Sequence, residues 1–106
     1  MTDIELLTLA ANAAGARYDD EMSCWMIQHS DRVWREWRPL TDDGDALRLA
    51  VKLGIEPCWH ERAGYAVGRA VPPSGHVIRI EEFGDDPYAA TRRAIVKAAA
   101  EIGRSK

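Results

Sequence analysis

The sequence predicts an α+β fold in which a mainly antiparallel sheet is layered with three helices as an α-β-α sandwich. Apolar residues recur at helical spacing over residues 3–14, 42–53 and 87–102. Between the second and third of these segments lie three short stretches with alternating patterns, separated by turn residues. The order is helix, short strand, helix, three strands, helix. A chain of 106 residues fits one domain, residues 1–106.

The first helix has signals at both ends. Thr2 and Glu5 have the spacing of a capping box, in which the threonine side chain accepts from the backbone three residues on. Gly15 supplies a left-handed residue after the last turn. The predicted buried stripe is Leu6, Leu7, Ala10 and Ala14.

Residues 16–39 have a less regular pattern. Residues 18–21 are typical of a turn, and residues 24–28 mix aromatic and β-branched side chains as a short strand does. Residues 31–39 fit neither period well, and Pro39 disfavours helix at the preceding residue. We expect an irregular connection or an edge strand there.

The second helix is predicted over residues 42–53. Thr41 is its expected N-cap, and Asp42, Asp43 and Asp45 lie in the first turn, where the positive end of the helix favours them. Gly54 is the expected stop. The predicted apolar stripe is Ala46, Leu49, Ala50 and Leu53, widened by Leu47 and Val51.

The three strands are predicted at residues 56–62, 65–70 and 76–83. Ala63 and Gly64 form the first turn, and residues 72–75 (PPSG) break the chain before the third strand. Alternation places Cys58 and His60 on one face of the first strand.

The last helix begins with Asp86 as N-cap and Pro87 at the first helical position, and Gly103 is its expected stop. Its predicted buried stripe is Tyr88, Thr91, Ile95, Ala98, Ala99 and Ile102. Its predicted solvent face is Arg92, Arg93, Lys97 and Glu101.

Composition excludes several classes of protein. The net charge of −3 argues against broad, charge-driven coating of nucleic acid. No apolar run approaches the roughly 20 residues of a membrane span. The N-terminus is acidic, unlike a secretory signal, so we expect a cytoplasmic protein. Cys24 and Cys58 are expected as buried free thiols in that compartment.

No complete catalytic or metal motif is present. Asp42, Asp43 and Asp45 lack the spacing of a calcium loop, and helix capping explains them. Cys58 and His60 would need two further ligands for zinc, or an orienting group for nucleophilic catalysis. We therefore expect no cofactor, no metal and no enzymatic activity.

One local cluster is suggestive, because aromatic and guanidinium groups alternate along it: Arg32, Trp34, Arg35, Trp37 and Arg38. Tryptophan and arginine are enriched at protein-binding hot spots, and they also stack on bases and meet phosphates. A third interpretation is that one or both tryptophans simply pack in the core. Arg92, Arg93 and Lys97 would extend a nucleic-acid surface along the last helix.

The stretch from Trp37 to Ile55, with its core PLTDDGDALRLA, resembles a family of small phage and prophage proteins described as having a phage ABA-sandwich domain. Residues 89–100 (AATRRAIVKAAA) are similar to that family's terminal helix. The resemblance extends over most of the chain and is strongest in these two blocks. It implies a helix–sheet–helix layering and a prophage origin, with no established activity and no catalytic residues to carry over.

The leading hypothesis is a non-enzymatic prophage accessory protein that binds a protein partner through residues 32–38. A nucleic-acid-binding module and a metal-assisted enzyme remain as alternatives. Self-association also remains open, since a strand edge near residues 24–28 would pair with a second copy.

Overall fold

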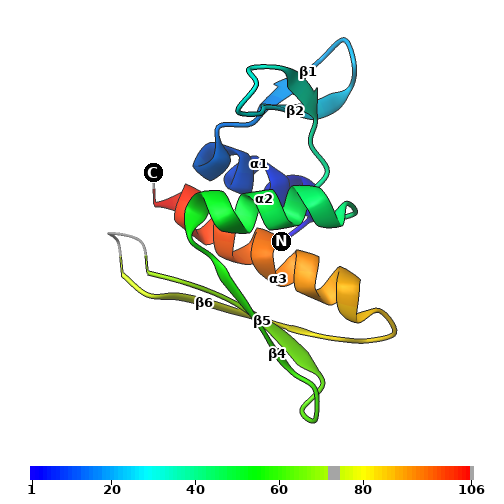
Figure 1. Ribbon diagram of the computed structural model, residues 1–106, viewed down its shortest axis with the longest axis vertical. Helices are drawn as coiled ribbons and strands as arrows, with labels where there is room; N and C mark the ends of the chain where they lie inside the picture. The colour runs from blue at the N-terminus through cyan, green and yellow to red at the C-terminus, as the bar shows by residue number, and fades with distance from the viewer. Residues whose placement is uncertain (72–74, 106) are drawn as a thin grey trace.

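The computed structural model describes residues 1–71 and 75–105. The helices are α1 (Asp3–Ala14), α2 (Asp43–Leu53) and α3 (Pro87–Arg104), as Figure 1 shows. One antiparallel sheet contains β1 (Arg17–Asp19), β2 (Cys24–Gln28) and β3 (Trp34–Glu36). The other contains β4 (Glu56–His60), β5 (Tyr65–Ala70) and β6 (Val77–Glu82). The predicted α+β class is confirmed; part of the predicted break, residues 72–74, lies outside the described residues.

The helices lie between the two sheets (Figure 1). α1 and α2 cover one side of α3, and the β4–β6 sheet packs on the other side of α3. The prediction of one main sheet with helices on both faces is therefore corrected. Residues 17–36 pair among themselves as a separate meander, and all three helices lie on the same side of the β4–β6 sheet.

The helix ends follow the local signals closely. Thr2 Oγ1 accepts from the Glu5 amide at 3.2 Å, and Asp86 caps α3. The predicted N-cap of α2 was one residue early, because Asp42 Oδ2 accepts from the Asp45 amide at 2.8 Å. Gly15 and Gly54 adopt the left-handed conformation expected of helix stops.

The prediction that Gly103 ends α3 is wrong, because the helix continues to Arg104. It lies instead where α3 crosses α1. A Cβ at this position would lie 1.7 Å from the Leu9 carbonyl oxygen, a distance no real contact allows. The glycine therefore permits the backbones of α1 and α3 to approach directly, and the alanine-rich side of α3 completes the contact.

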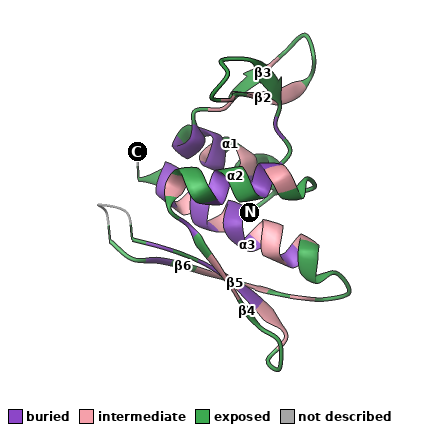
Figure 2. Ribbon diagram, viewed as in Figure 1, coloured by how far each residue is buried: buried purple, intermediate pink, exposed green. Residues whose placement is uncertain are grey.

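The β4–β6 sheet uses a similar close approach. A Cβ on Gly68 of β5 would lie 2.5 Å from the Ala94 carbonyl oxygen of α3. Ala66, Ala70 and Val77 are buried on this inner face, as Figure 2 shows for the strand segments next to α3. Alternation sends the isoleucines of β6 to the outer face.

β2 is the central strand of the β1–β3 sheet, so the predicted free edge at residues 24–28 is wrong. β2 pairs with β1 on one side and with β3 on the other. β3 is an edge strand, one of the two alternatives predicted for residues 31–39. β1 includes the first two residues of the turn predicted at residues 18–21, which corrects that prediction. Trp25 and Ile27 attach this sheet to the helical core.

Candidate functional site

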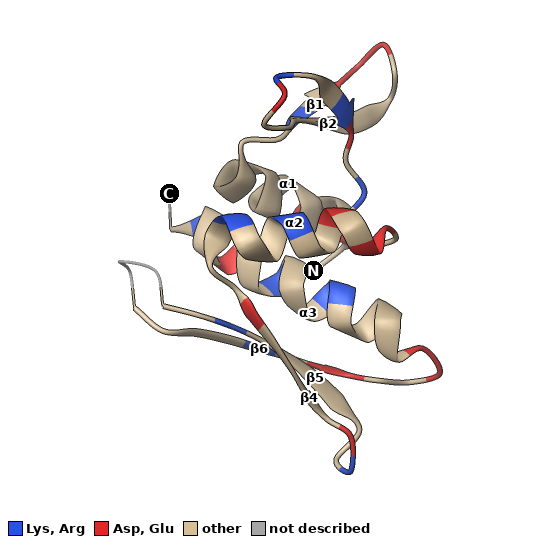
Figure 3. Ribbon diagram, in the orientation of Figure 1, with Lys and Arg blue, Asp and Glu red and all other residues tan. Residues whose placement is uncertain are grey.

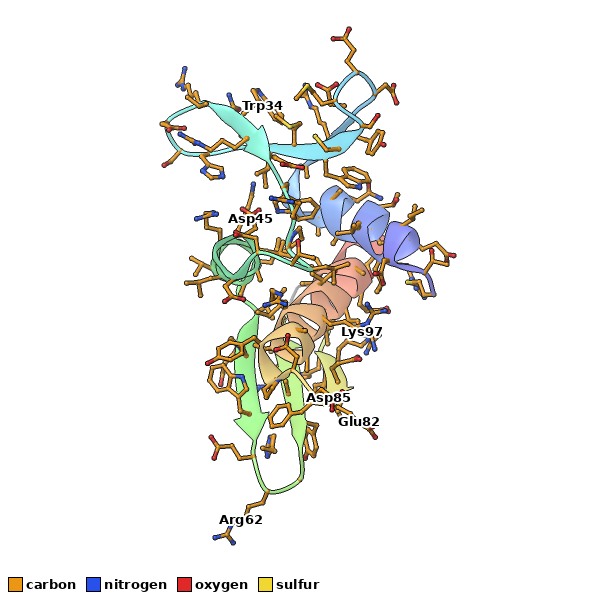
Figure 4. The ribbon with its side chains drawn as sticks, turned by 90° about the vertical axis from the view of Figure 1, so that its right-hand side faces the viewer. Trp34, Asp45, Arg62, Glu82, Asp85 and Lys97 are labelled. Carbon is orange, nitrogen blue, oxygen red and sulfur yellow. The ribbon has the colours of Figure 1, made fainter. Side chains whose placement is uncertain are left out.

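The two tryptophans of the suggestive cluster have opposite environments. Trp37 is only 2% exposed and makes an edge-on contact with Trp25, with ring centroids 6.4 Å apart. Trp34 is 37% exposed, and the Arg17 guanidinium carbon lies 5.0 Å from the centroid of its ring. Figure 4 shows Trp34 on the β1–β3 sheet. Trp37 is therefore a core residue, which corrects its place in the predicted contact surface.

The arginines of the cluster do not line up with Trp34 either. Arg35 follows Trp34 along β3, so the two side chains leave opposite faces of the sheet. Arg32 occupies the turn between β2 and β3 with φ of 67°. Arg38 lies beyond the strand, and its Nε is 3.8 Å from the Oε2 of Glu36. Residues 32–38 thus present no single face on which aromatic and cationic groups alternate.

Arg35 has a local structural partner in Asp31. Its two terminal nitrogens donate to the Asp31 carboxylate at 2.6 and 3.1 Å, and the Val33 amide donates to the same group at 3.0 Å. These hydrogen bonds from Arg35 and Val33 lower the pKa of Asp31 to about 2. The pair closes the β2–β3 turn.

The acids at residues 42–45 are structural. Asp42 caps α2, and Asp43 accepts from Arg92 of α3 at 2.6 Å. Asp45 is buried, and its two oxygens accept from the Arg38 amide at 2.9 Å and from Arg48 at 2.7 Å. Figure 4 shows Asp45 on the side of α2 that faces the β1–β3 sheet. Within residues 1–71 and 75–105, no group of three or more His, Cys, Asp or Glu side chains is arranged to hold a metal.

The cysteines are free thiols, but they are partly rather than fully buried. Partial burial raises the pKa of the Cys24 thiol, and the negative charges of Glu36 and Asp19 raise it further. A catalytic thiol needs the opposite shift. Cys58 and His60 share the outer face of β4, where the His60 ring stacks on Tyr65 with centroids 4.7 Å apart.

The predicted basic face of α3 is a set of tertiary ion pairs. Arg92 donates to the Leu40 carbonyl at 2.9 Å and to Asp43. Arg93 donates to Asp3 of α1 at 2.7 Å, and Lys97 pairs with Glu81 of β6. Figure 3 shows acidic segments beside the basic residues of α2 and α3. Each of these three cations joins α3 to another element, which corrects the assignment of this side of the helix to solvent.

The largest departure from prediction is on α2. Leu47 and Val51 were placed in the buried stripe, yet they are 60% and 76% exposed. They border a groove of about 480 Å³ between α2 and β2, which Ile27 and Trp37 also line. The signal was present in the sequence, since apolar residues cover more of the circumference of α2 than one buried stripe requires.

A second hollow, of about 290 Å³, begins on the other side of Leu47. Pro57 and Trp59 of β4 and Pro87 and Tyr88 of α3 form its walls. Tyr88, predicted as buried, is 70% exposed. We call the two hollows and the helix face between them the α2 surface.

No protein family model, curated protein or solved structure matches the chain. None of the helices in the described part of the chain is long and apolar enough to cross a bilayer.

Proposed function

We propose that this protein is a non-enzymatic binding module for a protein partner, and that the α2 surface is the contact site. The observation that carries the proposal is the exposure of Leu47 and Val51 on a helix whose other side buries Ala46, Leu49 and Ala50. Exposed apolar surface that continues into grooves on both sides is typical of an interaction site. The fully paired state of Arg92, Arg93 and Lys97 favours a protein over a nucleic acid.

The partner segment that suits this surface is an amphipathic helix. Leu47 and Val51 are four residues apart and form one ridge, against which the apolar stripe of a second helix packs. Arg48 and Lys52 line the same groove and are exposed, although Arg48 pairs with Asp45 and Lys52 donates to the Ala14 carbonyl, so acidic residues flanking the partner's stripe would complement them. Trp37 and Ile27 form apolar surface of the groove into which a large side chain would insert.

The proposal includes a prophage accessory role in a bacterial cytoplasm. The prophage origin rests on the resemblance of residues 37–55 and 89–100 to the phage sandwich family. The cytoplasmic location is supported by the two free cysteines, which lie in different sheets. Phage genes on both sides of the coding sequence would support the origin, and a position among unrelated chromosomal genes would contradict it.

The binding test uses a designed 14-residue amphipathic helix with leucines at positions i, i+3, i+4 and i+7 and flanking glutamates. Fluorescence anisotropy measures its affinity for the full chain. The control peptide has the same composition in a scrambled order. We expect the ordered peptide to bind, and Leu47→Asp and Val51→Asp each to weaken binding at least about tenfold, because a buried unpaired carboxylate is costly.

Ile4→Asp is the matched control protein, because Ile4 is also an exposed apolar helix residue but lies on α1. It should leave the affinity unchanged. Equal binding of the scrambled peptide, or full binding by Leu47→Asp and Val51→Asp, would sink the proposal.

A further inference from the structure

The outer face of the β4–β6 sheet is the second uncovered surface of the molecule. Strand pairing arranges its residues in three rows, each crossing all three strands. The rows are Glu56, Arg69 and Ile78; Cys58, Val67 and Ile80; and His60, Tyr65 and Glu82. All of them point away from α3, because Gly68, Ala66 and Val77 occupy the inner face. In Figure 1, all three helices lie on the opposite side of this sheet.

The middle of this face is apolar. The central row carries no charge, and Ile80 is 56% exposed. Ile78, in the neighbouring row, is 49% exposed. An antiparallel sheet with one solvated face normally places polar residues there. Among the described residues, no helix or strand covers this row, so its hydrophobic surface is left for another molecule.

The ends of the face decide which molecule fits. One end carries Arg69, which is half exposed although it pairs with Glu56 at 3.0 Å. The other end carries the exposed carboxylate of Glu82, which projects from β6 in Figure 4, and the aromatic ring of Tyr65. One end thus carries the Arg69–Glu56 ion pair and the other carries Glu82, Tyr65 and His60, so a half-turn places Arg69 against Tyr65 and Glu82 and places Glu56 against His60.

We propose that this face is a homodimer interface, in which the sheets of two copies stack face to face. The two-fold axis runs across the strands, parallel to the sheet. It brings Arg69 over Tyr65 and next to Glu82 of the second copy. The central row then lies on itself, with Val67 over Val67 and Cys58 near Cys58. Stacked sheets of this kind lie about 10 Å apart.

The other simple arrangement has its axis parallel to the strands, and electrostatics disfavours it. It would place Arg69 directly over Arg69 of the second copy, and like charges facing one another across an interface cost affinity. It would also place Cys58 over Ile80. The two arrangements therefore differ in which residues of the two copies meet.

The interface is small, with three rows of three residues on each copy. Standard stable interfaces use about 20–30 residues a side. We therefore expect a dimer that forms at high protein concentration and dissociates on dilution. It uses the outer face of the sheet, whereas the α2 surface reaches only Pro57 and Trp59 on the inner face of β4.

Sedimentation velocity of the full chain from about 10 µM to 1 mM should show a monomer becoming a dimer. Ile80→Lys should remain monomeric throughout, with unchanged circular dichroism because Ile80 is exposed. Val51→Lys is the matched control on α2 and should dimerise like the wild type. A wild type that stays monomeric at 1 mM would overturn the inference, as would an Ile80→Lys variant that still dimerises.

Two further variants test the orientation. Arg69→Glu should weaken the dimer several-fold, and adding Glu82→Arg should restore it. A short bis-maleimide should link two copies through Cys58 in Cys24→Ser but give no dimer in Cys58→Ser. Absence of the Cys58 link at concentrations where the dimer is populated would contradict the across-strand axis.

Discussion

Asp45 holds the chain between β3 and α2 in place: its Oδ2 accepts a hydrogen bond from the backbone N–H of Arg38 at 2.9 Å. Its Oδ1 accepts from Arg48 at 2.7 Å, and its own amide donates to Asp42. The buried carboxylate of Asp45 thus joins the loop at Arg38 to the side chain of Arg48, and the amide of the same residue joins the helix cap at Asp42. This connection sets the position of α2 relative to Trp37 and so shapes the groove.

We expect Asp45→Asn to lower the free energy of unfolding by about 2 kcal/mol, because a buried charge-assisted network loses one of its acceptors. Urea denaturation followed by circular dichroism measures this change. Asp85→Asn is the control, since Asp85 is exposed in the turn before α3. Equal stability of the two variants would show that the Asp45 network contributes little.

Gly103→Ala should be the most damaging methyl addition in the chain. Its Cβ would lie 1.7 Å from the Leu9 carbonyl oxygen, so α1 and α3 would have to separate. We expect a loss of about 3 kcal/mol. Gly44→Ala is the matched control, because the atoms nearest the added methyl would be side-chain atoms of Arg48 and Asp42, at 3.1 to 3.3 Å, rather than the backbone of another helix. That variant should be neutral or slightly more stable, since alanine favours helix. A near-neutral Gly103→Ala would contradict the close crossing.

Arg92 should matter for stability. It is largely buried, and it donates to the Leu40 carbonyl and to Asp43. Arg92→Ala should cost about 2 kcal/mol, because it leaves the Leu40 carbonyl without this donor. Arg62→Ala, at the exposed tip of the β4–β5 turn in Figure 4, should cost under about 0.5 kcal/mol. Thermal denaturation of both variants provides the comparison.

The same ion pairs lead us to expect no specific binding of nucleic acid. Labelled single- and double-stranded oligonucleotides are titrated at low salt, where phosphate contacts are strongest. We expect no saturable binding by the wild type. Saturable binding that falls with salt and with Arg93→Ala and Lys97→Ala would instead support the nucleic-acid alternative.

The β2–β3 turn should loosen in acid. Asp31 has a pKa of about 2, below its ordinary value of 3.8, so its ionised form is favoured in the folded protein. Its stabilising contribution is present above about pH 4 and is lost as the pH falls toward 2. A carboxyl carbon NMR titration should give a midpoint near 2, and Arg35→Gln should raise it. A wild-type midpoint near 3.8 would show that the pair does not form in solution.

Local signals predicted the elements well because they act over a few residues. Thr2, Gly15, Gly54 and Asp86 lie where the caps of α1, α2 and α3 need them. The strands at residues 24–28 and 65–70 have the predicted bounds. The N-cap of α2 was misplaced by one residue, since Thr41 and Asp42 are both good caps and only the structure shows which oxygen reaches the Asp45 amide.

The candidate site was predicted less well, because burial depends on elements distant in the chain. Trp34 and Trp37 have similar sequence surroundings, yet Trp37 lies in the core and Trp34 lies on the outer face of a three-stranded sheet. The prediction that Leu47 and Val51 belong to the buried stripe is wrong for the same reason. The apolar arc of α2 is wide, and the sequence does not say which part of it the neighbours cover.

By itself, the sequence determined the order of the three helices and of most strands, the α+β class and the placement of Asp42, Asp43 and Asp45 at the start of the second helix. These depend on backbone hydrogen bonds and side-chain periodicity within one element. The tertiary structure decided the division into two sheets, the role of Gly103 as a crossing point and the pairing of the cations on α3. Those features depend on which elements pack together, and packing is settled by close contacts such as Gly103 with Leu9 and Gly68 with Ala94.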